Sequence, residues 1–202
     1  MLKLYWHPFS TYARRVRIAL LEKNVEAELA VVDMEARDHR REPYLSLNPY
    51  GRVPTIVDDD LVLYESTSIL EYLEAKHPSQ SLLPADIKGR ALVSMHMKAC
   101  DLNFARAVGV VIFSKRFVPE ASWRKGEMDR ATADVGKALA IVEKQLAGKE
   151  YLVGDRYSLA DLCYVPFLEF MHLVDQTVPP NVKAWSDRLS ARPSSVATRA
   201  AR

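Results

Sequence analysis

The chain of 202 residues has few cysteines and no long apolar run. Its two cysteines, Cys100 and Cys163, lie far apart among apolar residues, so the sequence contains no disulfide framework and no metal-ligand spacing. This usage is typical of a reducing compartment. No run of about 18 apolar residues is present, and the N-terminal MLKLYWHPFS lacks the apolar core of a signal peptide. We therefore expect a cytoplasmic protein without a membrane span.

Strong charge of one sign and glycine-rich phosphate loops are also missing. The 28 basic and 26 acidic residues give a net charge of only +2, so nothing indicates a nucleic-acid partner. The seven glycines form no G-x-G, which excludes dinucleotide and Walker loops, and no G-x-S-x-G, which argues against a hydrolase nucleophile elbow. With 49% apolar and 27% charged residues, the composition is that of an ordinary globular protein with one large or two small domains.

The first part of the chain alternates strand-like and helix-like segments. Apolar spacing and turn residues predict strands at residues 2–6, 28–33, 54–58 and 61–64, and helices at residues 12–23, 39–46 and 66–76. The order is βαβαββα, with a tight turn at Asp59-Asp60. We expect one mixed four-stranded sheet covered by helices, which makes this an α/β domain.

The remainder of the chain is predicted to be all-helical. Residues 77–86, HPSQSLLPAD, contain two prolines and no periodicity, so they are interpreted as a linker. Two long helical segments are separated by Pro119, a third helix starts near Ser158, and a fourth runs from about Pro180 to Leu189. The polar tail, residues 191–202, is expected to be loose. The predicted domains are therefore 1–76 and 87–202.

Ser10 lies where a strand ends and a helix begins. Unpaired N–H groups and the helix dipole stabilise an anion at such a place, and a thiolate there has a pKa below the usual ~8.5. A serine hydroxyl could donate a hydrogen bond to that sulfur. Both cysteines are far away in the sequence, so the thiol would belong to a ligand. The alternative is that Ser10 only caps the helix.

Two further dipeptides could form walls of the same site. A cis bond at Val53-Pro54 would free the Val53 backbone to pair with an extended peptide, whereas a trans proline at a strand start would be ordinary. At Glu65-Ser66, Ser66 is the expected N-cap of the next helix. Its hydroxyl and the helix N–H groups could hold a carboxylate, with Glu65 as partner for an ammonium. The alternative is again a cap alone.

Basic residues supply a place for a second carboxylate. His39 and Arg40 lie in a basic cluster, and Arg52 precedes Val53. In isolation such residues would be a solvated face. Together with Ser10, Val53 and Glu65-Ser66, however, the set matches one thiol, one peptide backbone, one ammonium and two carboxylates. These are the groups of glutathione.

The order of these segments resembles the glutathione transferases. HPFSTYARRVRIALLEKNV is similar to the start of phi-like, serine-type members, and DHRREPYLSLNPYGRVPTIVDDDLVLYESTSILEYL resembles the glutathione-site block with its cis-proline, Pro54. YLVGDRYSLADLCYVPFL resembles a helix motif in which Ser158 and Asp161 form a capping box. The resemblance covers almost the whole chain. It implies a thioredoxin-like N-terminal domain and a C-terminal helical bundle.

The resemblance also implies roles for the residues in the first helix region. Ser10 would stabilise the thiolate, with Thr11 as the substitute if the register differs by one. Tyr5 is a poor candidate, because the tyrosine position of other classes falls on Trp6 and Tyr5 would point to the opposite face of the strand.

The remaining glutathione contacts follow from the same resemblance. His39 and Arg40 would hold the glycyl carboxylate, helped by Arg52, which stands where phi members often have Gln or Lys. Val53 would pair with the cysteinyl backbone. Glu65 and Ser66 would hold the γ-glutamyl end.

A second substrate would lie between the domains, and its apolar lining implies an apolar electrophile. The residues expected to line this site are Phe9, Tyr12, Met97, Cys100, Phe104 and Phe113. For the last four, plain helical core is the alternative. Tyr50 matches an aromatic anchor of the family's homodimers, with a packed turn aromatic as its alternative.

The expected activity is attack of the glutathione thiolate on an electrophile by addition or substitution, without a metal. Two alternatives stay open. One is a non-catalytic interaction protein with the same fold, and the other is a glutathione-dependent isomerase, peroxidase or dehalogenase. RRVRIALLEKN resembles the first helix of zeta-type isomerases, but the Ser-Ser-Cys stretch that precedes it in those enzymes is missing. Serine rather than cysteine at position 10 disfavours thiol–disulfide exchange.

Overall fold

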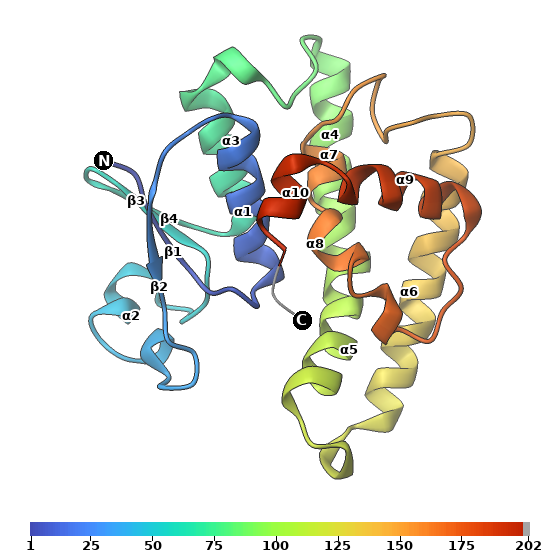
Figure 1. The fold of residues 1–202 in the computed structure, drawn as a ribbon, viewed down its shortest axis with the longest axis horizontal. Coiled ribbons are helices and arrows are strands. Elements are labelled where there is room, and N and C mark those ends of the chain that lie inside the picture. The colour runs from blue at the N-terminus through green and yellow to red at the C-terminus, as the bar shows by residue number, and fades with distance from the viewer. Residues whose placement is uncertain (200–202) are drawn as a thin grey trace. The chain divides into compact units, whose positions relative to one another are not determined.

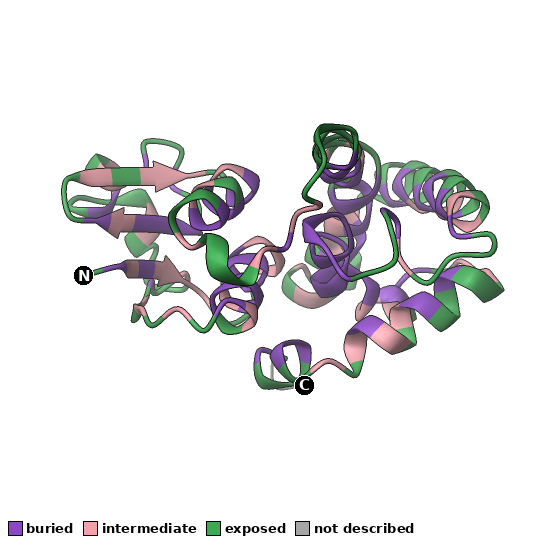
Figure 2. Ribbon diagram, turned by 90° about the horizontal axis from the view of Figure 1, so that it is seen from above, coloured by how far each residue is buried: buried purple, intermediate pink, exposed green. Residues whose placement is uncertain are grey.

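A computed structural model describes residues 1–199 of the chain. The chain divides into two compact units, one formed by Met1–Leu82 together with the segment that begins at Pro193, and one formed by Leu83–Arg192. Within each unit, buried residues gather where helices face the sheet or one another (Figure 2). No helix among residues 1–199 is long and apolar enough to cross a membrane.

The first unit contains the mixed four-stranded sheet that the sequence predicts. Its strands are β1 (Lys3–Trp6), β2 (Glu28–Val31), β3 (Thr55–Asp58) and β4 (Leu61–Tyr64). Their spatial order is β2-β1-β3-β4 (Figure 1). The β1–β2 pair is parallel, and the β1–β3 and β3–β4 pairs are antiparallel. The turn between β3 and β4 passes through Asp59 at φ +54°, as its sequence predicts.

Two helices cover one side of this sheet. α1 (Thr11–Glu22) and α3 (Ser66–Lys76) lie side by side there (Figure 1). Both bury apolar stripes, and the pair is joined by a buried ion pair in which Lys23 Nζ lies 3.0 Å from Glu74 Oε2. Lys23 also donates to the Gln80 carbonyl in η2 (Pro78–Gln80), which brings part of the predicted linker into the packed unit.

The predicted helix at residues 39–46 is two short elements instead. η1 (Asp38–Arg40) is a 3₁₀ turn and α2 (Tyr44–Leu47) is a single helical turn. Pro43 stands between them. Proline has no N–H and disfavours helical backbone in the residue before it, so a continuous helix is excluded here. α2 lies on the side of the sheet opposite to α1 (Figure 1).

The expectation of a loose C-terminal tail is wrong for the described residues. α10 (Pro193–Ala197) packs against α1, and Ser194, Ser195 and Thr198 are buried. Polar composition suggested solvation, but the Ser194 hydroxyl, the Ser195 carbonyl and the Thr198 hydroxyl are paired with side chains of α1. The segment therefore belongs with the first unit, although the sequence placed it in domain 87–202. Residues 200–202 of the predicted tail lie outside the described residues.

The second unit is helical, as expected. A long helical run contains α4 (Ile87–Ala99), a π-helical stretch η3 (Cys100–Ala105) and α5 (Arg106–Phe117). The other elements are η4 (Glu120–Ser122), α6 (Lys125–Gln145), α7 (Leu159–Leu162), α8 (Val165–Leu168), η5 (Met171–Leu173) and α9 (Pro180–Ser190). The break at Pro119 between the two long helical segments agrees with the sequence prediction.

The predicted capping box is present at the start of α7. Ser158 N and Oγ each lie 3.0 Å from Asp161 Oδ2. The buried carboxylate also accepts the Leu152 N–H and the Trp185 indole N–H at 3.0 Å. Burial raises the pKa of Asp161, and these donors act in the opposite direction. Asp161 is thus a structural centre of the helical unit.

Candidate functional site

The sheet register brings three of the predicted site segments to one end of the sheet. Tyr5 pairs with Thr55, and Thr55 pairs with Tyr64. The segment after β1, the segment before β3 and the segment after β4 therefore leave from the same end. These segments carry Ser10, Val53-Pro54 and Glu65-Ser66 respectively.

Ser10 is the N-cap of α1. Its backbone is extended, and its Oγ accepts a hydrogen bond from the Ala13 N–H at 3.1 Å. The Ser10 carbonyl accepts the Arg14 N–H at 3.0 Å, which closes the first turn. Because the hydroxyl accepts this bond, its own proton remains available for a ligand. Capping and ligand binding are thus compatible roles. Thr11 is the first helical residue, and its N–H has no partner within residues 1–199.

Val53 lies next to this helix start. The Val53–Pro54 peptide bond is cis, as the sequence suggested. The Val53 side chain is buried in a cluster with Ala13, Val32 and Tyr44. Its backbone N–H and C=O have no hydrogen-bonding partner in the described part of the chain. An extended peptide could therefore pair with Val53 beside the N-terminus of α1.

A buried hydrogen-bond network fixes the loop that carries Val53. The Tyr44 hydroxyl donates to the Arg52 carbonyl at 2.6 Å, and Asn48 Nδ2 donates to the same carbonyl at 2.8 Å. Thr55 Oγ1 contacts both side chains at 2.9 and 3.2 Å. Burial raises the pKa of Tyr44, so the phenol stays neutral. Tyr44 and Asn48 were not predicted as site residues, and their only signal in the sequence is an asparagine directly before the proline of the turn.

Glu65 stands in a strained backbone position. Its φ of +70° and ψ of 114° lie outside the ordinary regions for a residue with a side chain. Glu65, not Ser66, is the N-cap of α3, so that detail of the prediction is corrected. Ser66 is the first helical residue. The N–H groups of Ser66, Thr67 and Ser68 have no partner within residues 1–199, which leaves them free to face an anion.

Arg15 links the starts of the two helices. It is fully buried, and its Nη1 donates to Ser66 Oγ at 3.2 Å. Its guanidinium also lies 5.0 Å from the centre of the Tyr12 ring. This arginine was not among the site residues predicted from the sequence. Its position three residues before the buried Ile18 was the available signal.

The basic residues of η1 lie against the same loop. Gly51 has φ +56°, and a Cβ there would lie 2.5 Å from the His39 carbonyl, so glycine permits this close approach. His39 Nδ1 is buried without a partner within residues 1–199. Burial, and then the charges of Arg40 and Arg37, lower the pKa of His39. The Arg40 and Arg52 side chains are exposed.

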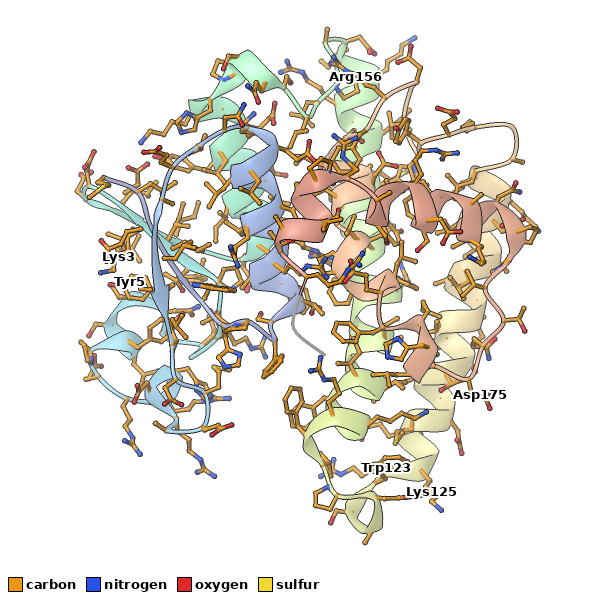
Figure 3. The ribbon with its side chains drawn as sticks, viewed as in Figure 1. Lys3, Tyr5, Trp123, Lys125, Arg156 and Asp175 are labelled. Atoms are coloured by element: carbon orange, nitrogen blue, oxygen red, sulfur yellow. The ribbon has the colours of Figure 1, made fainter. Side chains whose placement is uncertain are left out.

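Tyr5 and Trp6 occupy opposite faces of β1. The Tyr5 ring packs against Tyr44 with its centre 5.8 Å away, and it lies on the same side of the strand as Lys3 (Figure 3). Trp6 instead lies under the guanidinium of Arg17 at 4.2 Å. Tyr5 thus serves the packing of α2, in agreement with its rejection as a site residue.

The residues predicted to line a second substrate fall into two groups. Phe9 and Phe113 are exposed and Tyr12 is half-buried. Met97, Cys100 and Phe104 are buried in the helical unit. The Cys100 thiol donates to the Cys163 carbonyl at 3.5 Å, and the Phe104 ring packs on Tyr164. These three are core residues, which was their alternative interpretation, and their burial gives no support to a binding role.

Residues 1–199 contain no group of three or more His, Cys, Asp or Glu side chains that could hold a metal ion.

Comparisons with known proteins agree with this geometry. Residues 4–81 match the family described as "Glutathione S-transferase, N-terminal domain", and residues 105–193 match its C-terminal domain. Glutathione S-transferase F13 of Arabidopsis thaliana is 36% identical over 96% of this chain and 92% of the relative.

Solved structures of glutathione transferases are also similar to this chain. Glutathione transferase F7 from Populus trichocarpa has a TM-score of 0.89 at 32% identity, covering 98% of this chain and 97% of the other. A glutathione transferase from Burkholderia graminis, described with two glutathione molecules per subunit, has a TM-score of 0.87 at 29% identity, covering 98% and 86%. The sequence resemblance is confirmed, and the chain belongs to the glutathione S-transferase family.

Proposed function

We propose that this protein conjugates glutathione to apolar electrophiles, with the glutathione thiolate held at the N-terminus of α1 by Ser10. The observation that carries the proposal is the Ser10 hydrogen bond. Its Oγ accepts the Ala13 N–H at 3.1 Å, so the hydroxyl proton is available to a partner outside the helix. The relatives named glutathione S-transferases support the reaction class.

The reaction starts with loss of the thiol proton to water. The Ser10 hydroxyl and the N-terminal dipole of α1 stabilise the thiolate, so the sulfur is ionised near neutral pH. In substitution, a C–S bond forms while the bond to the leaving group breaks, and the leaving group takes the electron pair. In addition, the C–S bond forms at one carbon of an activated double bond, and the other carbon takes a proton from water.

Three sets of groups hold the rest of glutathione in this proposal. The unpaired Val53 N–H and C=O pair with the cysteinyl backbone. Glu65 binds the γ-glutamyl ammonium, and Ser66 with the first N–H groups of α3 binds the adjacent carboxylate. His39 and the two exposed arginines around Gly51 bind the glycyl carboxylate by charge-assisted hydrogen bonds.

The electrophile lies beside the sulfur, against the apolar residues that flank Ser10. Phe9 is 41% exposed and immediately precedes Ser10, and Tyr12 follows two residues later. Such a lining favours aromatic or alkyl electrophiles. The cytoplasm suits this chemistry, because its reducing poise keeps glutathione in the thiol form.

A homodimer completes the proposal. Leu92, Met95 and Leu102 are exposed at helical spacing, and Leu102 and Ile141 lie on a groove of about 590 Å³ formed by η3, α5 and α6. Tyr50 is 60% exposed and packs edge-on against Tyr64, which suits an anchor inserted into a second copy. Sedimentation of the parent, Tyr50→Ala and Leu102→Asp tests this. A monomeric parent would contradict it.

The thiol pKa of bound glutathione, followed by ultraviolet titration, tests the catalytic proposal. In the parent we expect a pKa well below that of the free thiol. Ser10→Ala should restore a value near the free thiol and lower kcat by about 10²-fold. Thr11→Val is the matched control, because it removes the neighbouring hydroxyl and keeps the cap. If Thr11→Val shows the loss and Ser10→Ala does not, the assignment of the hydroxyl is wrong.

A further inference from the structure

We infer that Arg14 and the C-terminal segment Pro193–Thr198 form a clasp that positions the catalytic end of α1. Arg14 is a positioning residue in this inference, since it acts through Ser10 rather than on the substrate. The inference rests on the proposed function of Ser10, and it concerns a segment that the sequence suggested to be loose.

The clasp consists of buried hydrogen bonds between parts of the chain that are far apart in sequence. Arg14 Nη2 donates to the Ser195 carbonyl at 2.9 Å, and Arg14 Nε donates to Thr198 Oγ1 at 3.2 Å. The Thr198 hydroxyl in turn donates to the Ser194 carbonyl at 2.9 Å. At the other end of α1, Ser194 Oγ donates to the Glu22 carboxylate. The C-terminal segment thus forms hydrogen bonds with α1 near both ends of the helix.

The position of Arg14 in α1 gives its contact with the C-terminal segment an electrostatic role. A cation near the first turn of a helix opposes the helix dipole, so Arg14 is in an electrostatically poor position with respect to its own helix. The first turn of α1 contains no acidic residue that would compensate. The Ser195 carbonyl, among the last of α10, has no partner within that helix and accepts the guanidinium instead. The C-terminal segment therefore makes a cation tolerable close to the start of α1.

The backbone connects this clasp to the reacting sulfur. The Arg14 N–H donates to the Ser10 carbonyl at 3.0 Å, and the adjacent Ala13 N–H donates to Ser10 Oγ at 3.1 Å. An anchored Arg14 side chain holds the first turn in place, and with it the direction of the Ser10 hydroxyl. A displacement of that hydroxyl by even about 1 Å would weaken its bond to the thiolate, and misplacements of this size reduce rates strongly.

Two variants of the 202-residue chain distinguish a positioning role of Arg14 from an effect of its charge alone. Arg14→Met removes the charge and the hydrogen bonds to Ser195 and Thr198, whereas Thr198→Val keeps the charge and removes one anchor with little change of volume. Matched controls are Arg188→Met on α9 and Thr132→Val on α6. The readouts are the thiol pKa of bound glutathione, kcat, the KM for glutathione, and the affinity for S-methylglutathione, which has no thiol to ionise.

We expect the thiol pKa to rise in both variants, by about half a pH unit or more in Arg14→Met and by less in Thr198→Val. The kcat should fall by up to about tenfold, while the S-methylglutathione affinity and both controls stay at the parent values. If the thiol pKa rises in Arg14→Met but not in Thr198→Val, the effect is due to the charge of Arg14 alone, and the inference is wrong. Unchanged thiol pKa values in both variants, with only a lower melting temperature, would overturn it in favour of a purely structural contact.

Failure of this inference is distinguishable from failure of the proposed function. If the parent protein itself does not lower the thiol pKa of glutathione, the role of Ser10 is refuted. If the parent lowers it and both clasp variants match the parent, only the clasp is refuted.

Discussion

The Arg15 guanidinium donates a hydrogen bond to Ser66 Oγ at 3.2 Å and is itself completely buried. Because Ser66 Oγ accepts from Arg15, the Ser66 hydroxyl proton is left to donate to a ligand carboxylate. The same arrangement occurs at Ser10, where a backbone N–H takes the place of the arginine. In both places a fixed donor inside the protein turns a serine hydroxyl into a donor toward the ligand.

Arg15→Met should therefore weaken recognition of the γ-glutamyl carboxylate. We expect the KM for glutathione to rise by roughly tenfold, since hydrogen bonds to charged groups contribute about 1.5–3 kcal/mol, with a smaller change in kcat. The measurement compares glutathione with 4-aminobutyryl-cysteinylglycine, which lacks that carboxylate. The parent should discriminate strongly between them and Arg15→Met weakly. Equal discrimination in both proteins would mean that Arg15 only packs, and Arg90→Met serves as the control.

His39 should couple glutathione binding to pH. Burial and the neighbouring Arg40 and Arg37 lower its pKa in the free protein, and a bound glycyl carboxylate would raise it. A group whose pKa rises on binding strengthens the complex below its free pKa, and this gain is lost as pH rises through the bound pKa. The affinity should thus decrease as pH rises from the free pKa of His39, which lies below the ordinary value of about 6.5, to its bound pKa, by up to about tenfold for each pH unit between the two.

Calorimetry with S-methylglutathione checks this coupling without interference from thiol ionisation. His39→Gln, or esterification of the glycyl carboxylate, should flatten the pH profile. His7 also has a pKa lowered by burial, so His7→Gln is the control that should keep the slope. If the pH dependence of the affinity persists in His39→Gln and disappears in His7→Gln, then His7 and not His39 is responsible for it.

Asp58 should contribute stability that depends on pH. It accepts hydrogen bonds from Lys76 and from the Tyr72 hydroxyl, and these, Lys76 first, lower its pKa. A carboxylate with a lowered folded-state pKa stabilises the protein above its unfolded pKa of about 3.9, and the benefit is lost as pH falls through the folded value. Asp58→Asn should lower the melting temperature at pH 7, and the difference from the parent should shrink below about pH 4.

Thermal unfolding at pH 7, 5 and 3 measures this contribution. Asp134→Asn, which affects an exposed pair with Lys137, is the matched control and should change little at any pH. A difference between Asp58→Asn and the parent that stays constant down to pH 3 would show that packing, not ionisation, explains the effect.

Local patterns sufficed to predict much of the fold and part of the site. The order of strands and helices along the chain and the positions of α1 and α3 follow from apolar spacing, and Ser10 was recognisable because a cap depends only on its neighbours in the chain. The placement of Val53 follows from a single X-Pro step. These features involve interactions across a few residues, which a sequence displays directly.

Features that depend on distant partners were missed. Arg15 acquires its role from Ser66, 51 residues away. Arg14 acquires its role from Ser195, 181 residues away, so the polar stretch around Ser195 seemed solvated when it is buried. The left-handed backbone of Glu65 also has no local signature, because nothing in the sequence marks a residue that tertiary packing forces into strain.

The buried ion pair of Lys23 and Glu74 yields the last prediction. Their side chains are 1% and 5% exposed, and Glu74 also accepts the Leu82 N–H with both carboxylate oxygens. Lys23→Met leaves a buried carboxylate without its cation, which should cost about 3–5 kcal/mol. Adding Glu74→Gln removes the unpaired charge and keeps an acceptor for Leu82, so the double variant should be more stable than Lys23→Met alone. Urea unfolding measures both, with Lys183→Met, an exposed lysine, within about 0.5 kcal/mol of the parent. A double variant that is less stable than the single one would show that the carboxylate of Glu74 stabilises the protein through Leu82 rather than through Lys23.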